Sequence, residues 1–487
     1  MTNAAKKSDH QDNYVMLHLG LGSFHRAHQA VYFQELINQG ETNWSLAGAN
    51  IRPDMEDTIT KLQQQNGAYT LETITPDGTH TYETIQSIQT VISYTPGLTD
   101  VIQVGAQHST RIISFTVTEG GYYLDEHNRL DITHKEIKSD IEQNTLLTIY
   151  GAITAILRKR KANNSGAITL LSCDNLRSNG DRFRSGLIEF LRYSNDLEFL
   201  AWVENNTSCP NSMVDRITPR PSEDVRKRVS VATGWNDKCA LMAESFIQWV
   251  VEDHFCNGRP ALENVGVEMV ESVLPYEEAK IRILNSTHIC IAWAGALKGL
   301  TYIHEGVQDH FIHQMAHNYV VYDVIPCLSP SPIDLHAYLT TVLDRFSNPY
   351  LCDTNQRPGA DGFSKVPGFL LPTLRERLAS HHLFADTAMI LATFFVFLQH
   401  WNEGKLNFQY QDPALNPERV KMIFASDKPL IAFCNETALW AELTGHPSLI
   451  ALISQAHSKL TEWLDSSIEN SYAPQTISTS EKLSASL

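Results

Sequence analysis

The residues that could do chemistry gather in the segment from Pro275 to His288, which also contains Glu277, Lys280 and Asn285. Pro275 suits the first turn of a helix, because the amide hydrogen that proline lacks would have no partner there. At 100° per residue of an α-helix, the four polar side chains fall within an arc of about 140°. The segment therefore predicts a helix that presents a base, an amide and an imidazole on one face, in a row that suits an extended ligand.

These residue types fit the oxidation of a secondary alcohol. A base removes the hydroxyl proton while hydride passes to a nicotinamide, and hydrogen-bond donors hold the developing oxyanion. Lys280 can be that base only if its pKa falls, which partial burial would achieve by disfavouring the ammonium form. Asn285 can donate to the oxygen, and His288 can bond the same hydroxyl or a neighbouring one. Taken alone, Lys280 is equally typical of a surface lysine and His288 of a core histidine.

A glycine turn follows the first predicted strand, 14–19, and leads into a helical stretch that ends near Ile37. Gly20 and Gly22 permit a tight turn and let backbone amides approach a pyrophosphate, as in dinucleotide-binding folds. The third glycine of the usual fingerprint is missing, so a plain turn between strand and helix is the alternative.

The acidic residue that would hold a ribose hydroxyl is displaced from its usual place after the second predicted strand, 44–50. Asn50, Arg52 and Asp54 are the candidates at this position. Because an arginine here would also suit a 2′-phosphate, the spacing leaves NAD and NADP both open.

Two later predicted strands, 111–118 and 167–172, run into polar or glycine residues at Glu119 and at Asp174-Asn175. If all these strands are parallel, their carboxyl ends share one rim with the glycine turn, where α/β sheets place ligands. Asn175 would then supply a second amide to a site between two domains. A turn or a helix cap is the alternative interpretation of Asn175.

The pattern changes near residue 272, after which long helical stretches prevail at 289–305, 309–326, 333–346 and 388–401. We expect a Rossmann-like α/β domain with a mainly parallel sheet over 1–272 and a mostly α-helical domain over 273–487. Before the boundary, 244–251 predicts a helix and 265–273 a last strand. The two ends of the chain, 1–12 and from 473 onward, are expected to be frayed.

Composition excludes several classes of protein. With a net charge of −17 over 487 residues, the chain does not fit a nucleic-acid or anionic-membrane partner. The eight cysteines form no CxxC pair, which indicates reduced intracellular thiols rather than disulfides or a zinc site. The chain contains neither an apolar run of membrane-spanning length nor a signal-peptide pattern, so we expect a cytoplasmic protein.

The sequence resembles the polyol-specific long-chain dehydrogenases over nearly its whole length. The family pattern Lys-x-x-x-x-Asn-x-x-His is present as Lys280, Asn285 and His288. Three further stretches match the family, namely Gly20–His28, Thr118–Tyr122 and Ser172–Asn175. Within the family, the stretches Leu19–His28 and Asn285–His288, with the residues that follow from Cys290, are most similar to members that act on D-arabinitol.

The resemblance implies a role for each site residue. Lys280 would be the general base, Asn175 and Asn285 an amide cradle around the reacting oxygen, and His288 a substrate contact. Glu277 would pass protons between the lysine and solvent. Three polar groups would line the polyol site, namely Asp215, Arg357 and Lys365. The residues expected to bind the cofactor are Gly20, Leu21, Gly22, Phe24, Arg26, Thr118 and Glu119.

The resemblance further implies a metal-independent enzyme that uses NAD to oxidise a sugar alcohol to a ketose, with D-arabinitol and D-xylulose as the expected pair. Mannitol, or a sugar acid such as altronate or mannonate, is the alternative substrate, because Arg357 and Lys365 could hold a carboxylate. A nucleotide-binding sensor without catalysis is the alternative of a different class. We expect a monomer, with oligomers left open.

Overall fold

The computed structural model describes residues 13–125 and 128–472. The chain divides into two compact units, Met1–Glu277 and Glu278–Leu487, five residues beyond the boundary expected from the sequence. The predicted frayed ends, 1–12 and 473–487, lie outside the described residues.

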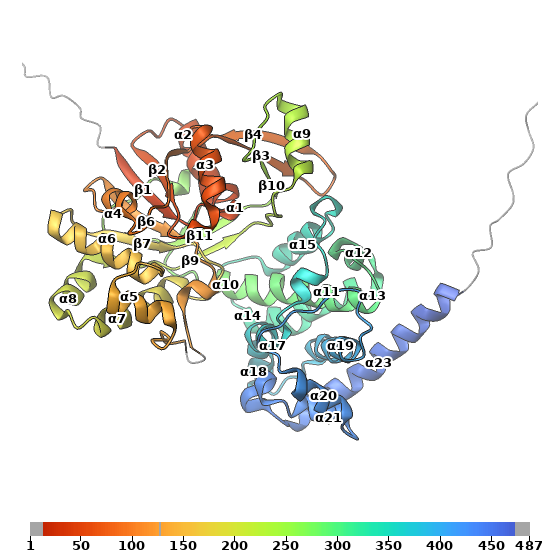
Figure 1. Cartoon of the computed structure of the whole chain (residues 1–487). Helices are drawn as coiled ribbons and strands as arrows, with labels where there is room; N and C mark the ends of the chain where they lie inside the picture. Colours follow the sequence, from red (N-terminus) through yellow and green to blue (C-terminus); the bar gives the residue numbers. More distant parts are fainter. Residues whose placement is uncertain (1–12, 126–127, 473–487) are drawn as a thin grey trace, which may run out of the picture. The chain divides into compact units, whose positions relative to one another are not determined.

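Unit 1 is built on a six-stranded parallel sheet with the strand order β5-β2-β1-β6-β7-β8. Its strands are β1 Tyr14–Leu19, β2 Trp44–Ala49, β5 Ile88–Ile92, β6 Thr110–Phe115, β7 Ile168–Ser172 and β8 Thr207–Ser208. Of these strands, Figure 1 labels β2, β1, β6 and β7. Because β1, β6 and β7 are parallel neighbours, the glycine turn, the 116–122 loop and Asp174-Asn175 follow the same edge of the sheet, as predicted.

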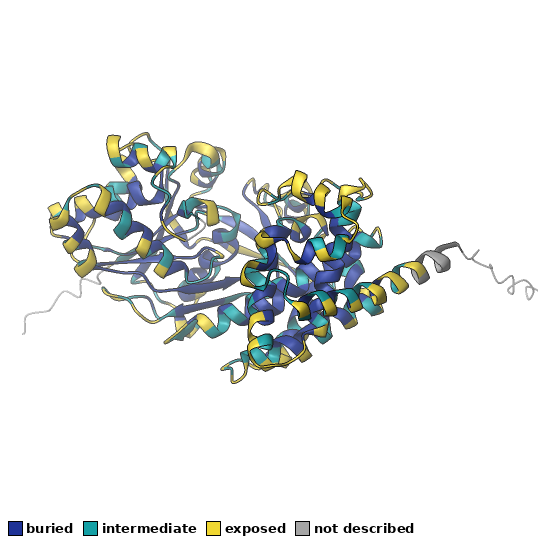
Figure 2. Ribbon diagram, turned by 90° about the horizontal axis from the view of Figure 1, so that it is seen from below, coloured by how far each residue is buried: buried dark blue, intermediate teal, exposed yellow. Residues whose placement is uncertain are grey.

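Side chains alternate across this sheet and feed two hydrophobic cores. In β1, Leu17 and Leu19 enter one core, whereas Met16 enters the other. The first core packs against α4 Thr99–Gly105, α6 Ile149–Asn163 and α7 Asn179–Tyr193, and the second against α2 Gln29–Asn38 and α3 Glu56–Gln64. Figure 2 shows the sheet in the dark blue of buried residues. A parallel sheet covered on both faces explains the nearly continuous apolar runs of its strands.

Two small sheets complete unit 1. One has the order β10-β3-β4, from Leu241–Glu244, Tyr69–Ile74 and His80–Ile85, and the other has the order β12-β11-β9, from Glu268–Val270, Gln248–Glu252 and Ser212–Asp215. The helix predicted at 244–251 is therefore wrong, and the strand predicted at 265–273 is shorter than expected. Val250 in β11 pairs with Met213 in β9, so a partner far along the chain decides the conformation of a short apolar run.

Unit 2 is helical, which confirms the predicted fold class of a Rossmann-like domain followed by a helical one. Among its described residues there is one isolated bridge, between Tyr302 and Thr354, and no strand. The principal helices are α11 Ser286–Leu297, α13 His310–Asn318, α15 Leu335–Phe346, α18 Leu371–Ala379, α19 Ala385–Asn402 and α23 Pro447–Tyr472. α11 lies in the interior, where Ile289 to Ala294 are at most 1% exposed.

The segment from Pro275 to His288 is not the plain α-helix that its spacing predicts. It consists of α10 Leu274–Ala279, a π-helical turn η4 over Lys280–Asn285, and then α11. The amide of Ser286 bonds the carbonyl oxygen of Ile281, five residues earlier, as a π turn requires. Two further π turns occur in unit 2, η5 Tyr319–Val324 and η7 Val366–Leu370, and both contact η4.

In the part of the chain that the structure describes, no helix is both long enough and apolar enough to cross a bilayer.

Candidate active site

The glycine turn opens a cleft of about 690 Å³ in unit 1. Gly20 has a φ of +108°, and a Cβ at this position would lie 2.2 Å from the carbonyl oxygen of Thr116. Only glycine therefore lets the turn pack against the end of β6. Gly20, Gly22 and Phe24 line the cleft together with Thr116 and Thr118.

Two of the predicted cofactor residues face the interior instead. The side chain of Leu21 is fully buried against Gly48, although its backbone amide donates to Oδ1 of Asn50 at 2.7 Å. Arg26 is 3% exposed and donates through Nη1 to the carbonyl oxygen of Cys239 at 2.6 Å. Arg26 does not line the cleft, so its side chain is not placed to contact a coenzyme bound there.

Asp174 holds the loop that forms one wall of the cleft. Its carboxylate accepts hydrogen bonds from the amides of Val117 and Thr118, at 2.9 and 2.7 Å, and from the hydroxyl of Tyr122 at 3.0 Å. Burial raises the pKa of Asp174 to about 6, against the opposing effect of these hydrogen bonds. Thr118 has a φ of +65°, a strained conformation for a β-branched residue. Glu119 follows in a short 3₁₀ turn and is exposed.

Arg52 lies in the same cleft, after β2, and its guanidinium is already engaged. Nη2 donates to the Tyr123 hydroxyl at 2.6 Å and forms an ion pair with Glu136 at 2.7 Å. Glu136 belongs to α5 Lys135–Gln143, which also lines the cleft. The positive charge that could attract a 2′-phosphate is therefore largely compensated.

Three further predicted residues belong to unit 1. Both carboxylate oxygens of Glu277 accept the amide of Ser178, at 3.0 and 3.1 Å, and Glu277 is 5% exposed. This bond fixes the end of the loop that carries Asn175, which is itself exposed. Asp215 is buried at the end of β9, where it pairs with Gln248.

The π turn changes how Lys280 and Asn285 are presented. In an α-helix, residues five apart point about 140° away from each other. A π turn closes its hydrogen bonds over five residues and holds more residues in each turn, so positions five apart point in more similar directions than in an α-helix. Lys280 and Asn285 are the two ends of η4, and they therefore share a face more closely than the spacing alone predicts. Lys280 is 7% exposed, as the expected base would need to be.

His288, in the first turn of α11, has a partner that the sequence does not reveal. Its Nε2 lies 2.9 Å from Oδ2 of Asp353, and its ring stacks on Phe346 with centroids 4.5 Å apart. The guanidinium of Arg357 donates to both oxygens of the same carboxylate, at 3.0 and 3.2 Å. Nearby, Nζ of Lys365 donates to the carbonyl oxygen of Pro358 at 2.9 Å.

Asp353 and Glu136 are candidate residues that the sequence does not reveal, and Asp174 was named there only beside Asn175. Asp353 contacts His288, 65 residues earlier, and Glu136 contacts Arg52, 84 residues earlier. No local sequence pattern predicts the contact between Asp353 and His288 or the contact between Glu136 and Arg52. Asp174 did carry a signal, because it follows directly after a buried strand and precedes Asn175.

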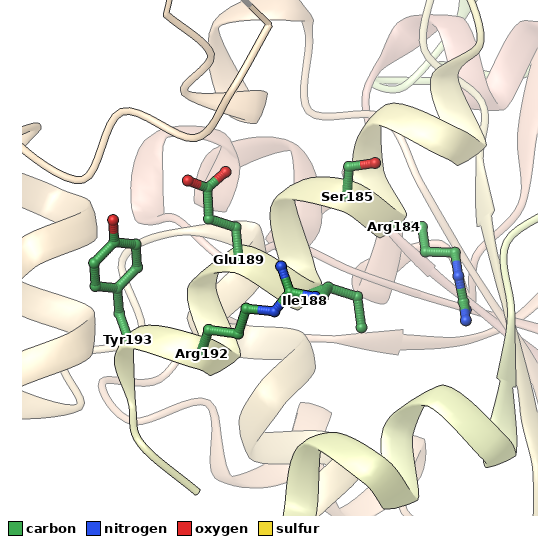
Figure 3. Close-up of a pocket in the computed structure, with 6 residues that line it drawn as sticks. All are labelled: Arg184, Ser185, Ile188, Glu189, Arg192 and Tyr193. Carbon is green, nitrogen blue, oxygen red and sulfur yellow. The ribbon is translucent and has the colours of Figure 1, made fainter. Parts of the chain in front are cut away.

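Two other features of the described residues offer no candidate site. Among the described residues, no group of three or more His, Cys, Asp or Glu side chains is arranged to hold a metal ion. A second hollow, of about 650 Å³, is lined by α7 alone (Figure 3), through Arg184, Ser185, Ile188, Glu189, Arg192 and Tyr193. A groove with residues of one helix and no opposing wall offers no convergent polar groups.

Comparison with known families matches this division of the chain. Residues 15–264 match the mannitol dehydrogenase Rossmann domain, and residues 272–461 match the mannitol dehydrogenase C-terminal domain. The chain belongs to the mannitol dehydrogenase family and is an oxidoreductase.

Individual relatives that are similar to this chain carry the names of particular enzymes. The chain is 52% identical to a D-arabinitol 4-dehydrogenase of Ralstonia nicotianae, over 92% of this chain and 97% of the relative. It is 48% identical to a D-arabinitol 4-dehydrogenase of Klebsiella pneumoniae, over 91% and 97% of the two chains. Its structure is similar to Pseudomonas fluorescens mannitol 2-dehydrogenase in a ternary complex with NAD and D-mannitol, with a TM-score of 0.80, 32% identity and coverage of 94% of both chains.

Proposed function

We propose that this enzyme uses NAD to oxidise a sugar alcohol to a ketose, with D-arabinitol as the substrate and D-xylulose as the product. Two relatives near 50% identity bear the name D-arabinitol 4-dehydrogenase, and the similar solved enzyme holds NAD and D-mannitol. The substrate class follows from the polar side chains of unit 2, and the coenzyme from the cleft of unit 1.

The observation that carries the substrate class is the bidentate pairing of Arg357 with Asp353. A sugar acid would need an uncompensated cation for its carboxylate, whereas a polyol presents only hydroxyl groups. Asp353 is 11% exposed at its side chain, and its ionised carboxylate already balances the charge of Arg357. A new carboxylate would meet like charge at close range, which is unfavourable. This pairing compensates Arg357, one of the two cations that altronate or mannonate would need, and so favours a neutral polyol.

For the chemical step, we assign Lys280 as the base that removes the proton from the reacting hydroxyl. Burial disfavours the ammonium form of an amine and so favours a neutral lysine that can accept a proton. Asn285, at the other end of the π turn, donates through its amide to the developing oxyanion, and Asn175 is the second donor. Glu277 carries the proton on to solvent.

The cleft of unit 1 fits the coenzyme. Gly20 and Gly22 leave the backbone accessible at the end of β1, and nothing except Gly20 itself lies within 4 Å of the position where a Cβ of Gly22 would be. Phe24 and Thr118 line the same space, and Glu119 follows in the same loop. When bound, NAD supplies the acceptor for the hydride that leaves the alcohol carbon. Compensation of Arg52 by Glu136 favours NAD over NADP, because a 2′-phosphate would have to compete with that carboxylate.

The direct test is the purified full-length enzyme on a panel of pentitols, hexitols and aldonates, each with NAD and with NADP, followed by NADH absorbance. We expect the highest kcat/KM with D-arabinitol and NAD. Highest turnover on an aldonate would contradict the substrate class, and highest turnover on mannitol would correct the particular polyol. Absence of turnover with every substrate, together with retained NADH binding, would favour a sensor.

A further inference from the structure

Asp353 lies where it can control the chemistry of His288, although it occurs in none of the motifs discussed above. Its backbone is pinned, because its carbonyl oxygen accepts the amide of Ile303 at 2.9 Å and the amide of Asn355 bonds Thr301 at 2.9 Å. Its side chain contacts both His288 and Arg357. The Asp353 carboxylate is therefore held in place and orients the side chains of His288 and Arg357.

The protonation states of the pair follow from their surroundings. Burial lowers the pKa of His288, and the neighbouring Asp353 only partly opposes this effect. Burial also raises the pKa of Asp353, but the contacts with His288 and Arg357 outweigh it and hold that pKa well below its usual value. At neutral pH the carboxyl is therefore ionised and the imidazole is neutral.

An ionised carboxylate can only accept hydrogen bonds, so Nε2 of the neutral imidazole must carry the proton that faces Asp353. The other ring nitrogen, Nδ1, then has a lone pair and no proton. Among the described residues Nδ1 has no hydrogen-bond partner, and it is not enclosed in the interior. It can accept a hydrogen bond but cannot donate one.

We propose that Asp353 is a positioning residue that fixes His288 as the Nε2–H tautomer, so that Nδ1 accepts a hydrogen bond from the substrate hydroxyl next to the reacting carbon. The consequence is a specificity rule: the enzyme requires a hydroxyl, which can donate, on that neighbouring carbon. Stacking of the ring on Phe346 fixes its plane, so the direction of the acceptor is fixed as well. This inference rests on the proposed polyol dehydrogenase activity.

The tautomer is measured first, because it does not depend on activity. Nitrogen-15 NMR of the histidine-labelled full-length enzyme identifies the His288 signals by their loss in His288→Gln. We expect a neutral ring protonated at Nε2 in the wild type and in Asp353→Asn, whose amide oxygen still accepts. Asp353→Ala should lose this preference, while Asp344→Ala, at an exposed position in α15, should not change it. An imidazolium, or an Nδ1–H ring in the wild type, would overturn the proposal.

The specificity rule is then tested with D-arabinitol and with deoxy analogues that lack either hydroxyl next to the reacting carbon. In the wild type, one analogue should lose at least about 10-fold in kcat/KM, the equivalent of one good hydrogen bond. The ratio of kcat/KM for D-arabinitol to kcat/KM for that analogue should fall toward one in Asp353→Ala and in His288→Gln. The same ratio should persist in Asp353→Asn and Asp344→Ala. A ratio unchanged by both Asp353→Ala and His288→Gln would refute the rule.

Should Asp353→Ala not fold, the wild-type spectrum, His288→Gln and Asp353→Asn decide the matter. A wild type that is inactive on all polyols but carries the Nε2–H ring would refute the proposed function and the substrate contact, while leaving the positioning by Asp353 intact.

Discussion

Replacement of Asp174 by asparagine should separate coenzyme binding from folding. The carboxylate accepts the amides of Val117 and Thr118 and the hydroxyl of Tyr122, which keeps Thr118 in its strained conformation. An asparagine of the same size can accept through one oxygen only. The Tyr122 hydroxyl then loses its bond to this side chain and keeps only its contact with Ser172, at a cost of about 1–3 kcal/mol. If that cost falls on the loop lining the cleft, the Kd for NAD rises roughly 5- to 150-fold.

The thermal stability of Asp174→Asn should change much less than its affinity for NAD. Burial raises the pKa of Asp174 from its usual 3.8 to about 6, despite the three hydrogen-bond donors. A raised carboxyl pKa means that this group favours the folded state below pH 3.8, and that the contribution is lost as the pH rises through 6. At 1.36 kcal/mol per pH unit, the ionised group opposes folding by about 3 kcal/mol at pH 8. Asparagine removes this penalty, so it offsets the loss of hydrogen bonds and Tm at pH 8 should stay close to wild type.

Calorimetric titration with NAD between pH 5 and 8 is the assay. In the wild type, Kd should rise as the pH falls through about 6, because protonation of Asp174 removes acceptors from the loop. In Asp174→Asn, Kd should be high throughout, and this step should disappear. A variant that binds NAD within twofold of the wild type and shows the same pH dependence would refute the reasoning.

Two further predictions concern the coenzyme and metals. Glu136→Gln frees Arg52 from its ion pair and should raise kcat/KM with NADP relative to NAD by about 10-fold, because a 2′-phosphate no longer faces a carboxylate whose repulsion is worth about 1–2 kcal/mol. Glu142→Gln, at an exposed position in the same helix α5, is the matched control. An unchanged NADP-to-NAD ratio in Glu136→Gln would show that Arg52 does not select the coenzyme. Because the proposed chemistry relies on Lys280 and amide donors, prolonged dialysis against a chelator should leave kcat unchanged, whereas a loss that zinc or another divalent ion restores would contradict metal independence.

The architecture of unit 1 could be predicted because its signals are local. The strands β1, β2 and β7 are apolar runs bounded by glycine or polar residues, and the turn at Gly20 requires glycine for a steric reason that the sequence already implies. Parallel pairing then brings three separate loops to one edge. The run at 244–251 was predicted wrongly as a helix, because a short apolar segment has no distinct period and its pairing with β9 is decided at long range.

The sequence named candidate residues for the site, whereas their geometry had to come from the structure. The spacing of Lys280, Asn285 and His288 indicated a shared helical face, yet nothing in the sequence indicated the π turn that brings positions 280 and 285 closer to one face. Asp353 and Glu136 were missed for another reason. Each contacts a residue more than 60 positions away, so the pairs exist only in the folded chain.

The measurement that tests the central claim most directly is the rate of polyol oxidation by Lys280→Ala, with NADH affinity measured by fluorescence in the same preparation. If Lys280 is the base, kcat should fall by about 10³- to 10⁴-fold, NADH should bind within a few-fold of wild type, and the rise of the wild-type rate with pH should vanish. Lys405→Ala, at an exposed position in the same unit, should behave as wild type. Turnover within tenfold of wild type, with an unchanged pH profile, would show that another group removes the proton.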